Sequence, residues 1–240
     1  MKRLCSVCVR KDSKGVPNKN IRPLLGKPLL IHSLDHARQS GLFDSIVVSS
    51  DSHIILRMAK DWGVNHTIDR PKSLASDTAN KLPVIQHSFR IAETLTGSTF
   101  DTIVDLDATS PLRNQEDLKG AVRLLESREE IANVITGAPA RRSPYFNLVE
   151  LDESGVAHLS GKSHSINKTI IRRQDAPPCF DLNASIYVWR RNSLLNASSV
   201  IQSDTHLYVM PEERSIDIDS ELDFLWVEFL MKYRNNIKQI

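Results

Sequence analysis

Short apolar runs alternate with longer segments of helical periodicity through the first half of the chain, and this alternation restricts the fold more than any other feature. The apolar runs predict strands at residues 4–9, 45–49, 65–68, 102–106 and 132–136. Apolar residues at helical spacing predict helices at residues 28–40, 51–62, 82–96 and 116–127. Strands and helices in this order form right-handed β-α-β units. We therefore predict a three-layer α/β/α fold with a mainly parallel central sheet that is covered on both faces.

The loops that follow the strands of such a sheet form its ligand-binding edge. In this chain the loops begin after Val9, Ser49, Leu106 and Thr136. Because parallel strands end at the same edge of a sheet, we expect these four loops to form one functional rim. The prediction concerns topology and leaves the chemistry open.

The pattern changes between residues 141 and 179. Short β-like pieces at residues 146–151, 156–159 and 169–172 replace the alternation. We interpret residues 141–179 as an excursion within a single domain of residues 1–240, a β-arm that packs on a second subunit. The chain then returns with a strand at residues 184–189 and closes with a helix at residues 221–233.

Charge and composition disfavour several classes of protein. A net charge of +2 over 240 residues is too small to indicate a nucleic-acid or membrane-surface partner, so an anionic ligand must be held by locally clustered Lys and Arg. The chain contains no run of roughly 20 apolar residues that could span a bilayer. Cys5, Cys8 and Cys179 cannot form a disulfide framework. We expect a cytoplasmic protein that binds neither nucleic acid nor membrane.

Residues 10–20, with the sequence RKDSKGVPNKN, directly follow the first predicted strand. A loop in this place can offer backbone N–H groups and ammonium groups together to a polyphosphate. The loop has neither the GxxxxGK[ST] pattern of a phosphate-binding loop nor the GxGxxG pattern of a dinucleotide fold. Taken alone, its composition also fits a solvated basic turn.

Several collinear motifs resemble those of one family, the CMP-sialic acid synthetases (acylneuraminate cytidylyltransferases). The 10–20 loop resembles the family signature RxxSKGxPxKN. Later segments are similar to the motifs RPxxLAxDxA, TSPLR, NGxIY and IDIDxxxDF, in the family order, at residues 70–79, 109–113, 183–187 and 216–224. These matches cover nearly the whole chain.

The resemblance implies a Rossmann-like nucleotidyltransferase fold, a homodimer, and transfer of CMP from CTP to the anomeric hydroxyl of a nonulosonic acid. Mg²⁺, with Mn²⁺ as the alternative, would be the cofactor. By resemblance, Arg10 and Lys19 would be catalytic residues that hold the triphosphate, since cationic groups stabilise the charge that develops in phosphoryl transfer. Ser13 and Asn20 would complete the contacts of the loop, and Arg70 would contact the nucleotide.

Asp217 and Asp219 are two residues apart, so on an extended segment both side chains point to one side. Two carboxylates at this spacing can share a hard cation, and the metal would then bridge them to the phosphates. Asp217 is also a catalytic candidate, because one carboxylate could instead accept the proton of the sugar hydroxyl. A helix N-cap is a further alternative for both residues, and more so for Asp219.

The chain departs from the family at several positions. Lys11 and Asp12 replace two glycines, and Lys81 replaces a serine at a position expected to contact the nucleotide. Asp107 replaces a glutamine that faces the sugar. A carboxylate there favours a substrate with an amino, amidino or additional hydroxyl group, so legionaminic, pseudaminic or 3-deoxy-octulosonic acid becomes an alternative to N-acetylneuraminic acid.

Further sugar-binding candidates are Arg172 and Arg173, as partners of the sugar carboxylate, and Tyr187, which could equally belong to the core. Two other functions remain open. Asp105 and Asp107 form a DxD pattern of the kind that binds a metal in GT-A glycosyltransferases. The substitutions at Lys11, Asp12 and Asp107 also fit a nucleotide-binding relative without catalytic activity.

Overall fold

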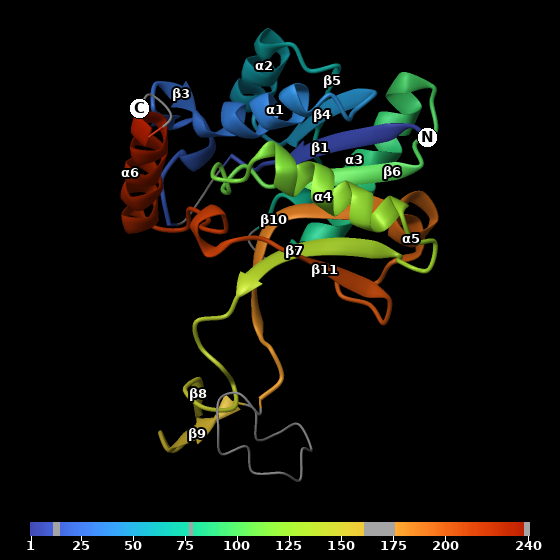
Figure 1. Cartoon of the computed structure of the whole chain (residues 1–240). Coiled ribbons are helices and arrows are strands. Elements are labelled where there is room, and N and C mark those ends of the chain that lie inside the picture. Colours follow the sequence, from blue (N-terminus) through green and yellow to red (C-terminus); the bar gives the residue numbers. More distant parts are fainter. Residues whose placement is uncertain (12–14, 77–78, 161–175, 238–240) are drawn as a thin grey trace.

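A computed structural model describes residues 1–11, 15–76, 79–160 and 176–237 of the protein (Figure 1). Its main sheet has seven strands in the order β11-β7-β10-β6-β1-β4-β5. The strands are β1 (Arg3–Cys8), β4 (Ser45–Ser50), β5 (His66–Asp69), β6 (Thr102–Leu106), β7 (Asn133–Pro139), β10 (Phe180–Arg190) and β11 (Thr205–Val209). β10 runs antiparallel to both of its neighbours, β6 and β7, and the other pairs are parallel. The predicted mainly parallel sheet is confirmed.

The described residues form six α-helices, five of which cover the two faces of this sheet. The six are α1 (Leu29–Ser40), α2 (His53–Trp62), α3 (Lys81–Thr96), α4 (Gln115–Glu126), α5 (Arg191–Asn196) and α6 (Glu221–Ile237). Helices α1, α2 and α4 form one core with residues such as Val7 of β1, whereas α3 and α5 form another with residues such as Leu4. Alternate residues of β1 therefore face opposite layers, as a pleated strand requires. The three-layer α/β/α fold predicted from the sequence is confirmed.

A third, smaller core lies beyond the end of the sheet. Phe224 and Val227 of α6 pack there on Val16, Leu29 and Ile218. Figure 1 shows α6 beside the antiparallel pair β2 (Pro23–Leu24) and β3 (Lys27–Pro28), at one end of the molecule. This core brings the first and last parts of the chain together next to the rim of the sheet. None of the helices in the described residues is long and apolar enough to cross a bilayer.

The hairpin of β8 (Val149–Leu151) and β9 (Ala157–Leu159) projects away from the main sheet (Figure 1). It lies within residues 141–179, where the sequence predicts an excursion. The piece predicted at residues 169–172 lies outside the described residues. Contact of this arm with a second subunit stays a prediction.

Arg113, the arginine of the TSPLR motif, joins three elements at the rim. Its side chain is buried, and Nη1 donates a hydrogen bond to the Ser185 carbonyl of β10 at 2.7 Å. Nη2 donates to the hydroxyl of Ser33 on α1 and to the Asp107 carbonyl after β6. Burial lowers the pKa of Arg113 to about 10, so the guanidinium is still charged at neutral pH. The arginine thus fixes the rim without facing the pocket.

Replacing Arg113 with methionine, which has similar length but no donors, is expected to lower the free energy of unfolding by at least about 3 kcal/mol. Several buried oxygens lose their donor, and each unsatisfied one costs roughly 1–3 kcal/mol. Urea denaturation measures the loss. The control Arg90→Met changes an exposed arginine of α3 and should alter stability by no more than about 0.5 kcal/mol. A loss below about 1 kcal/mol for Arg113→Met would contradict the assigned role.

Candidate functional site

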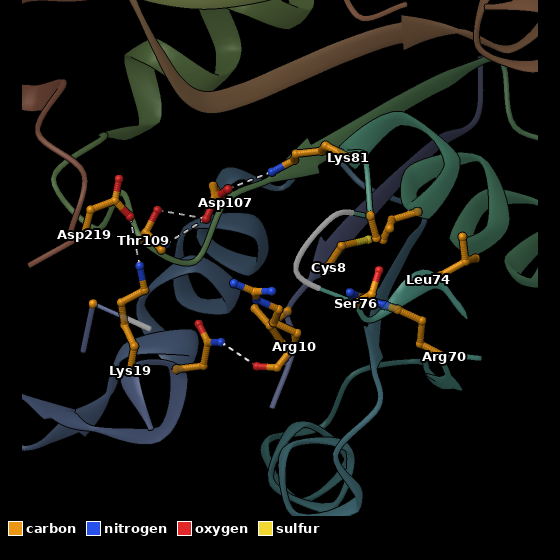
Figure 2. Close-up of a pocket in the computed structure, with 15 residues that line it drawn as sticks. Cys8, Arg10, Lys19, Arg70, Leu74, Ser76, Lys81, Asp107, Thr109 and Asp219 are labelled. Carbon is orange, nitrogen blue, oxygen red and sulfur yellow. Dashed lines mark hydrogen bonds and ion pairs between the residues drawn. The ribbon is translucent and has the colours of Figure 1, made fainter. Parts of the chain in front are cut away.

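A pocket of about 460 Å³ lies at the carboxyl ends of β1 and β6 (Figure 2). Segments from across the chain line it, and they contribute Cys8, Val9, Arg10, Gly15, Lys19, Asn20, Arg70, Leu74, Ser76, Ala79, Lys81, Val84, Asp107, Thr109 and Asp219. Two of the four loops that were predicted to form the rim, those after Val9 and Leu106, thus meet at this pocket. Arg10, Lys19, Asn20, Arg70, Lys81 and Asp107, all named from the sequence, line the same cavity.

The 10–20 loop presents its cationic groups to this pocket. In Figure 2 the Arg10 guanidinium points toward the centre of the cavity. Asn20 is buried, and its Nδ2 donates a hydrogen bond to the Arg10 carbonyl at 2.9 Å. Asn20 therefore holds the backbone of Arg10 in place. Ser13 lies outside the described residues, as does Asp12.

Lys19 connects this loop to the acidic segment near the C-terminus. Its Nζ donates a hydrogen bond to the Ile218 carbonyl and lies 3.1 Å from Oδ1 of Asp219. Gly15 makes a second contact between the loop and the acidic segment. Its backbone lies so close to Asp219 that an added Cβ would be 1.8 Å from the Asp219 carbonyl oxygen. Only glycine permits such an approach of two backbones. The sole glycine of the loop thus permits the contact that joins the loop to the acidic segment, a role that was not predicted from the sequence.

Asp217 and Asp219 flank a buried residue. Ile218 packs in the third core, and its N–H donates to the Thr109 carbonyl at 2.9 Å. Both aspartates line a second, adjoining cavity of about 670 Å³, and Asp219 alone also lines the first. Burial and the negative charge of Asp219 raise the pKa of Asp217. The two carboxylates share one side of the segment, as their spacing predicts.

The alternative that Asp217 or Asp219 caps helix α6 is wrong. The helix begins at Glu221, and Ser220 and Asp223 cap it reciprocally. The Asp223 carboxylate accepts from the Ser220 N–H at 2.8 Å, and the Ser220 hydroxyl accepts from the Asp223 N–H at 3.2 Å. This arrangement is a capping box. The Asp219 side chain, 76% exposed, is left for Lys19 and for a ligand.

Arg70 lies on the opposite wall of the pocket. Its side chain is buried, and Nη2 and Nε donate to the carbonyl and the hydroxyl of Ser49 at 2.7 and 3.3 Å. Ser49 belongs to β4, so the sheet itself orients the arginine. Its contact with a nucleotide stays a prediction.

The ammonium group of Lys81 lies between two carboxylates. Its Nζ is 2.7 Å from Oδ2 of Asp107 and 3.1 Å from Oδ2 of Asp105. The second contact is an ion pair without hydrogen-bond alignment, because Oδ2 of Asp105 has no hydrogen-bond partner among the described residues. A metal held by the DxD pattern would occupy this position between the carboxylates. The arrangement therefore disfavours the glycosyltransferase alternative.

Tyr187 is buried in the core between the sheet and α3, and its ring centre lies 5.0 Å from the Lys81 ammonium. The core alternative for this residue fits the structure, and no contact with a sugar is assigned to it. Arg172 and Arg173 lie outside the described residues. Cys8 lines the pocket, and burial together with the charge of Asp105 raises the pKa of its thiol to about 12, so it is not a nucleophile at neutral pH.

Thr109 is a second residue whose role the sequence reasoning missed. Its N–H and hydroxyl both donate to Oδ1 of Asp107, at 3.0 and 2.9 Å. A short turn of this kind is typical of an Asp followed two residues later by Thr. The D-x-T spacing at residues 107–109 was the signal that could have predicted it.

Comparisons with known proteins agree with this geometry. A family model described as Cytidylyltransferase matches residues 5–222. The chain is 43% identical over 232 residues to a CMP-N,N'-diacetyllegionaminic acid synthase of Campylobacter jejuni subsp. jejuni, with 97% of this chain and 96% of that protein covered. It is 30% identical over 229 residues to an N-acylneuraminate cytidylyltransferase of Streptococcus agalactiae, covering 95% of this chain and 52% of that protein.

A solved structure has the same fold. It is a CMP:2-keto-3-deoxy-manno-octonic acid synthetase complexed with CTP, with a TM-score of 0.69 and 15% sequence identity. The alignment covers 98% of this chain and 100% of that one. At this identity the likeness concerns the fold alone, and it confirms the Rossmann-like nucleotidyltransferase architecture.

Gly15→Ala should weaken CTP binding at least tenfold, because the added Cβ forces the loop away from the Asp219 carbonyl and moves Lys19 with it. Calorimetric titration with CTP measures the change. Gly97→Ala is the control: Gly97 ends α3 with a φ of +62° and has open space around it. That variant is expected to lose about 1 kcal/mol of stability and to keep its CTP affinity. Unchanged affinity in Gly15→Ala would show that the contact does not shape the site.

Proposed function

We propose, since the chain belongs to the cytidylyltransferase family, that it transfers CMP from CTP to the anomeric hydroxyl of a nonulosonic acid and releases pyrophosphate. The hydroxyl oxygen attacks the α-phosphorus, the bond from that phosphorus to the pyrophosphate oxygen breaks, and the hydroxyl proton passes to a base. The observation that carries the proposal is the rim itself, where Arg10, Lys19 and Asp219 line one pocket and the Lys19 ammonium lies 3.1 Å from the Asp219 carboxylate. Cations beside a carboxylate pair suit a triphosphate with its metal.

Arg10 and Lys19 hold the triphosphate in this proposal. An arginine can donate to two phosphate oxygens at once, and a lysine acts as a point charge. Lys19 is buried and fixed by the Ile218 carbonyl, so little conformational entropy is lost when a phosphate binds. Because both groups are placed before the reaction, they stabilise the charge that develops on the leaving pyrophosphate.

Asp217 and Asp219 fit a divalent cation, Mg²⁺ or Mn²⁺. Negative charge is crowded here: Asp219, Asp107 and Asp223 all raise the pKa of Asp217 after the effect of burial. Among the described residues no group of three or more His, Cys, Asp or Glu could hold a metal, so phosphate oxygens would complete the ligand set. The cation, when bound, supplies charge neutralisation at the phosphates. The raised pKa also suits Asp217 as the proton acceptor, the second role considered from the sequence.

The acid is proposed to be of the legionaminic type. The relative that is 43% identical is named as a synthase for CMP-N,N'-diacetyllegionaminic acid, and it is covered almost end to end. The Asp107 carboxylate at the pocket wall suits a substrate with N–H or O–H donors. N-acetylneuraminic, pseudaminic and 3-deoxy-octulosonic acids are the alternatives.

A homodimer in the cytoplasm is proposed as the working form. The exposed side chains of Val149, Leu151 and Val156 on the β8–β9 hairpin support an interface with a second copy. The free thiols of Cys5, Cys8 and Cys179 agree with a reducing compartment. Analytical ultracentrifugation tests the dimer: Leu151→Asp should shift the protein to a monomer, and a persistent dimer would remove the hairpin from the interface.

Pyrophosphate release from CTP tests the reaction, with a panel of N-acetylneuraminic, legionaminic, pseudaminic and 3-deoxy-octulosonic acids. We expect the highest rate of pyrophosphate release with a legionaminic acid. Absence of release with every acid would contradict the proposal. Turnover that requires a nucleotide sugar would favour a glycosyltransferase, and CTP binding without turnover would favour an inactive relative.

Asp217→Asn should lower the rate at least about 100-fold while the fold remains, because a metal ligand or base contributes several kcal/mol to the transition state. The matched control is Asp181→Asn, which changes a carboxylate of the same cavity and should keep most of the rate. If Asp217 binds metal, higher Mg²⁺ or added Mn²⁺ restores part of the rate; if it is the base, neither does. An unchanged rate would remove Asp217 from the mechanism.

A further inference from the structure

Lys81 is the first residue of α3, and its side chain lies beside Asp107 at one wall of the pocket (Figure 2) and 3.1 Å from the carboxylate of Asp105. We call these three residues the Lys81 triad. The Asp105 side chain is fully buried, whereas the side chains of Lys81 and Asp107 are 26% and 24% exposed. Lys81 and Asp107 are 26 positions apart in the chain, so their pairing depends on how α3 packs beside β6.

The Asp107 carboxylate is held by three donors. Oδ1 accepts from the N–H and hydroxyl of Thr109, and Oδ2 accepts from Lys81 at 2.7 Å. Burial alone would raise the pKa of Asp107, but the charge of Lys81 and these hydrogen bonds place it well below its usual range. Asp107 is therefore ionised and fixed, and a ligand that reaches it can only donate to it.

The charges of the triad do not favour a phosphate at this wall. One ammonium faces two carboxylates, which leaves a net charge of −1. The pKa of Lys81 is raised above its usual value because the charges of Asp107 and Asp105 outweigh burial, so the ammonium stays charged and paired. A phosphate that took Lys81 would have to separate it from both carboxylates and would leave Asp105 buried and unpaired, which is costly.

We propose that Lys81 is a positioning residue, which holds Asp107 ionised and oriented as the acceptor for an N–H group of the acid substrate, and that Lys81 and Asp107 form one specificity-determining unit. This inference rests on the proposed cytidylyltransferase function. It replaces the expectation from the sequence that Lys81 contacts the nucleotide. It also joins two departures from the family motifs, at residues 81 and 107, in one interaction.

A consequence concerns the choice of substrate. A glutamine can donate and accept, whereas an ionised aspartate only accepts. The group of the acid that faces Asp107 must therefore carry a hydrogen, as an acylamino N–H does. An analogue that presents only an acceptor sets its lone pair against that of the carboxylate oxygen and is rejected, because a desolvated acceptor that meets no donor costs binding.

Kinetic constants of Lys81→Met, Asp107→Asn and the double variant test the proposal on the full-length enzyme. Each single variant is expected to raise the KM for the acid about 10- to 100-fold, the cost of one hydrogen bond to a charged group. The KM for CTP should stay within about threefold. In the double variant the second change should add less than threefold, because the two residues act as one unit. Lys72→Met, an exposed lysine outside the pocket wall, is the control.

Asp107→Asn keeps Lys81 paired with Asp105 and the shape of the side chain, so it tests the account even if Lys81→Met folds poorly. A rise in the KM for CTP equal to that for the acid, or full additivity in the double variant, would overturn the proposal.

Calorimetry with CTP alone separates this inference from the proposed function. If the wild-type enzyme turns over no acid, the proposed function fails. The role of Lys81 is then judged on CTP affinity, which should be unchanged in Lys81→Met; a tenfold loss would make Lys81 a nucleotide ligand.

Discussion

The contact between the 10–20 loop and the acidic segment around Ile218 is the interaction on which the site depends. Two backbones meet at Gly15 and Asp219, and the Lys19 ammonium bridges the Ile218 carbonyl and the Asp219 carboxylate. These residues are separated by about 200 positions in the chain. Without this contact the cationic loop and the carboxylates, which we propose hold the triphosphate and its metal together, would lie on separate parts of the surface.

The order and direction of the strands determine which other residues reach the rim of the pocket. β10 enters antiparallel between β6 and β7, so its first residues arrive at the edge where the parallel strands end. Arg113 then ties that strand to α1 and to the loop after β6. The buried arginine therefore supports the pocket from behind: it fixes the backbone of Asp107, and the Asp107 side chain lines the pocket.

Much of the architecture could be predicted because apolar residues form short continuous runs in the buried strands of this fold and recur at helical spacing in its helices. The predicted ranges for β1, β4, β6 and α1 agree with the structure to within one or two residues. β11 and α5 were missed, since Thr205–Val209 is a half-exposed edge strand without an apolar run and Arg191–Asn196 has fewer than two turns. The antiparallel direction of β10 depends on how residues 141–179 lead the chain back to the sheet, and the sequence of the strand itself does not indicate it.

The positions of the site could also be predicted, but their partners could not. The motifs place Lys19, Lys81 and Asp107 near a ligand, yet periodicity says nothing about which charges meet across the pocket. The N-cap alternative for Asp219 shows the same limit, because Ser220 fits a cap equally well and the choice depends on where α6 begins. Ion pairs between distant segments become visible only once the fold brings them together.

A crystal structure of the complex with CTP and Mg²⁺ tests the central claim most directly. The account predicts the triphosphate between Arg10 and Lys19, the metal between the phosphates and the carboxylates of Asp217 and Asp219, and Lys81 still paired with Asp107. A triphosphate bound elsewhere, for instance in the cavity lined by Lys11 and Lys72, or Lys81 turned from Asp107 onto a phosphate, would contradict it.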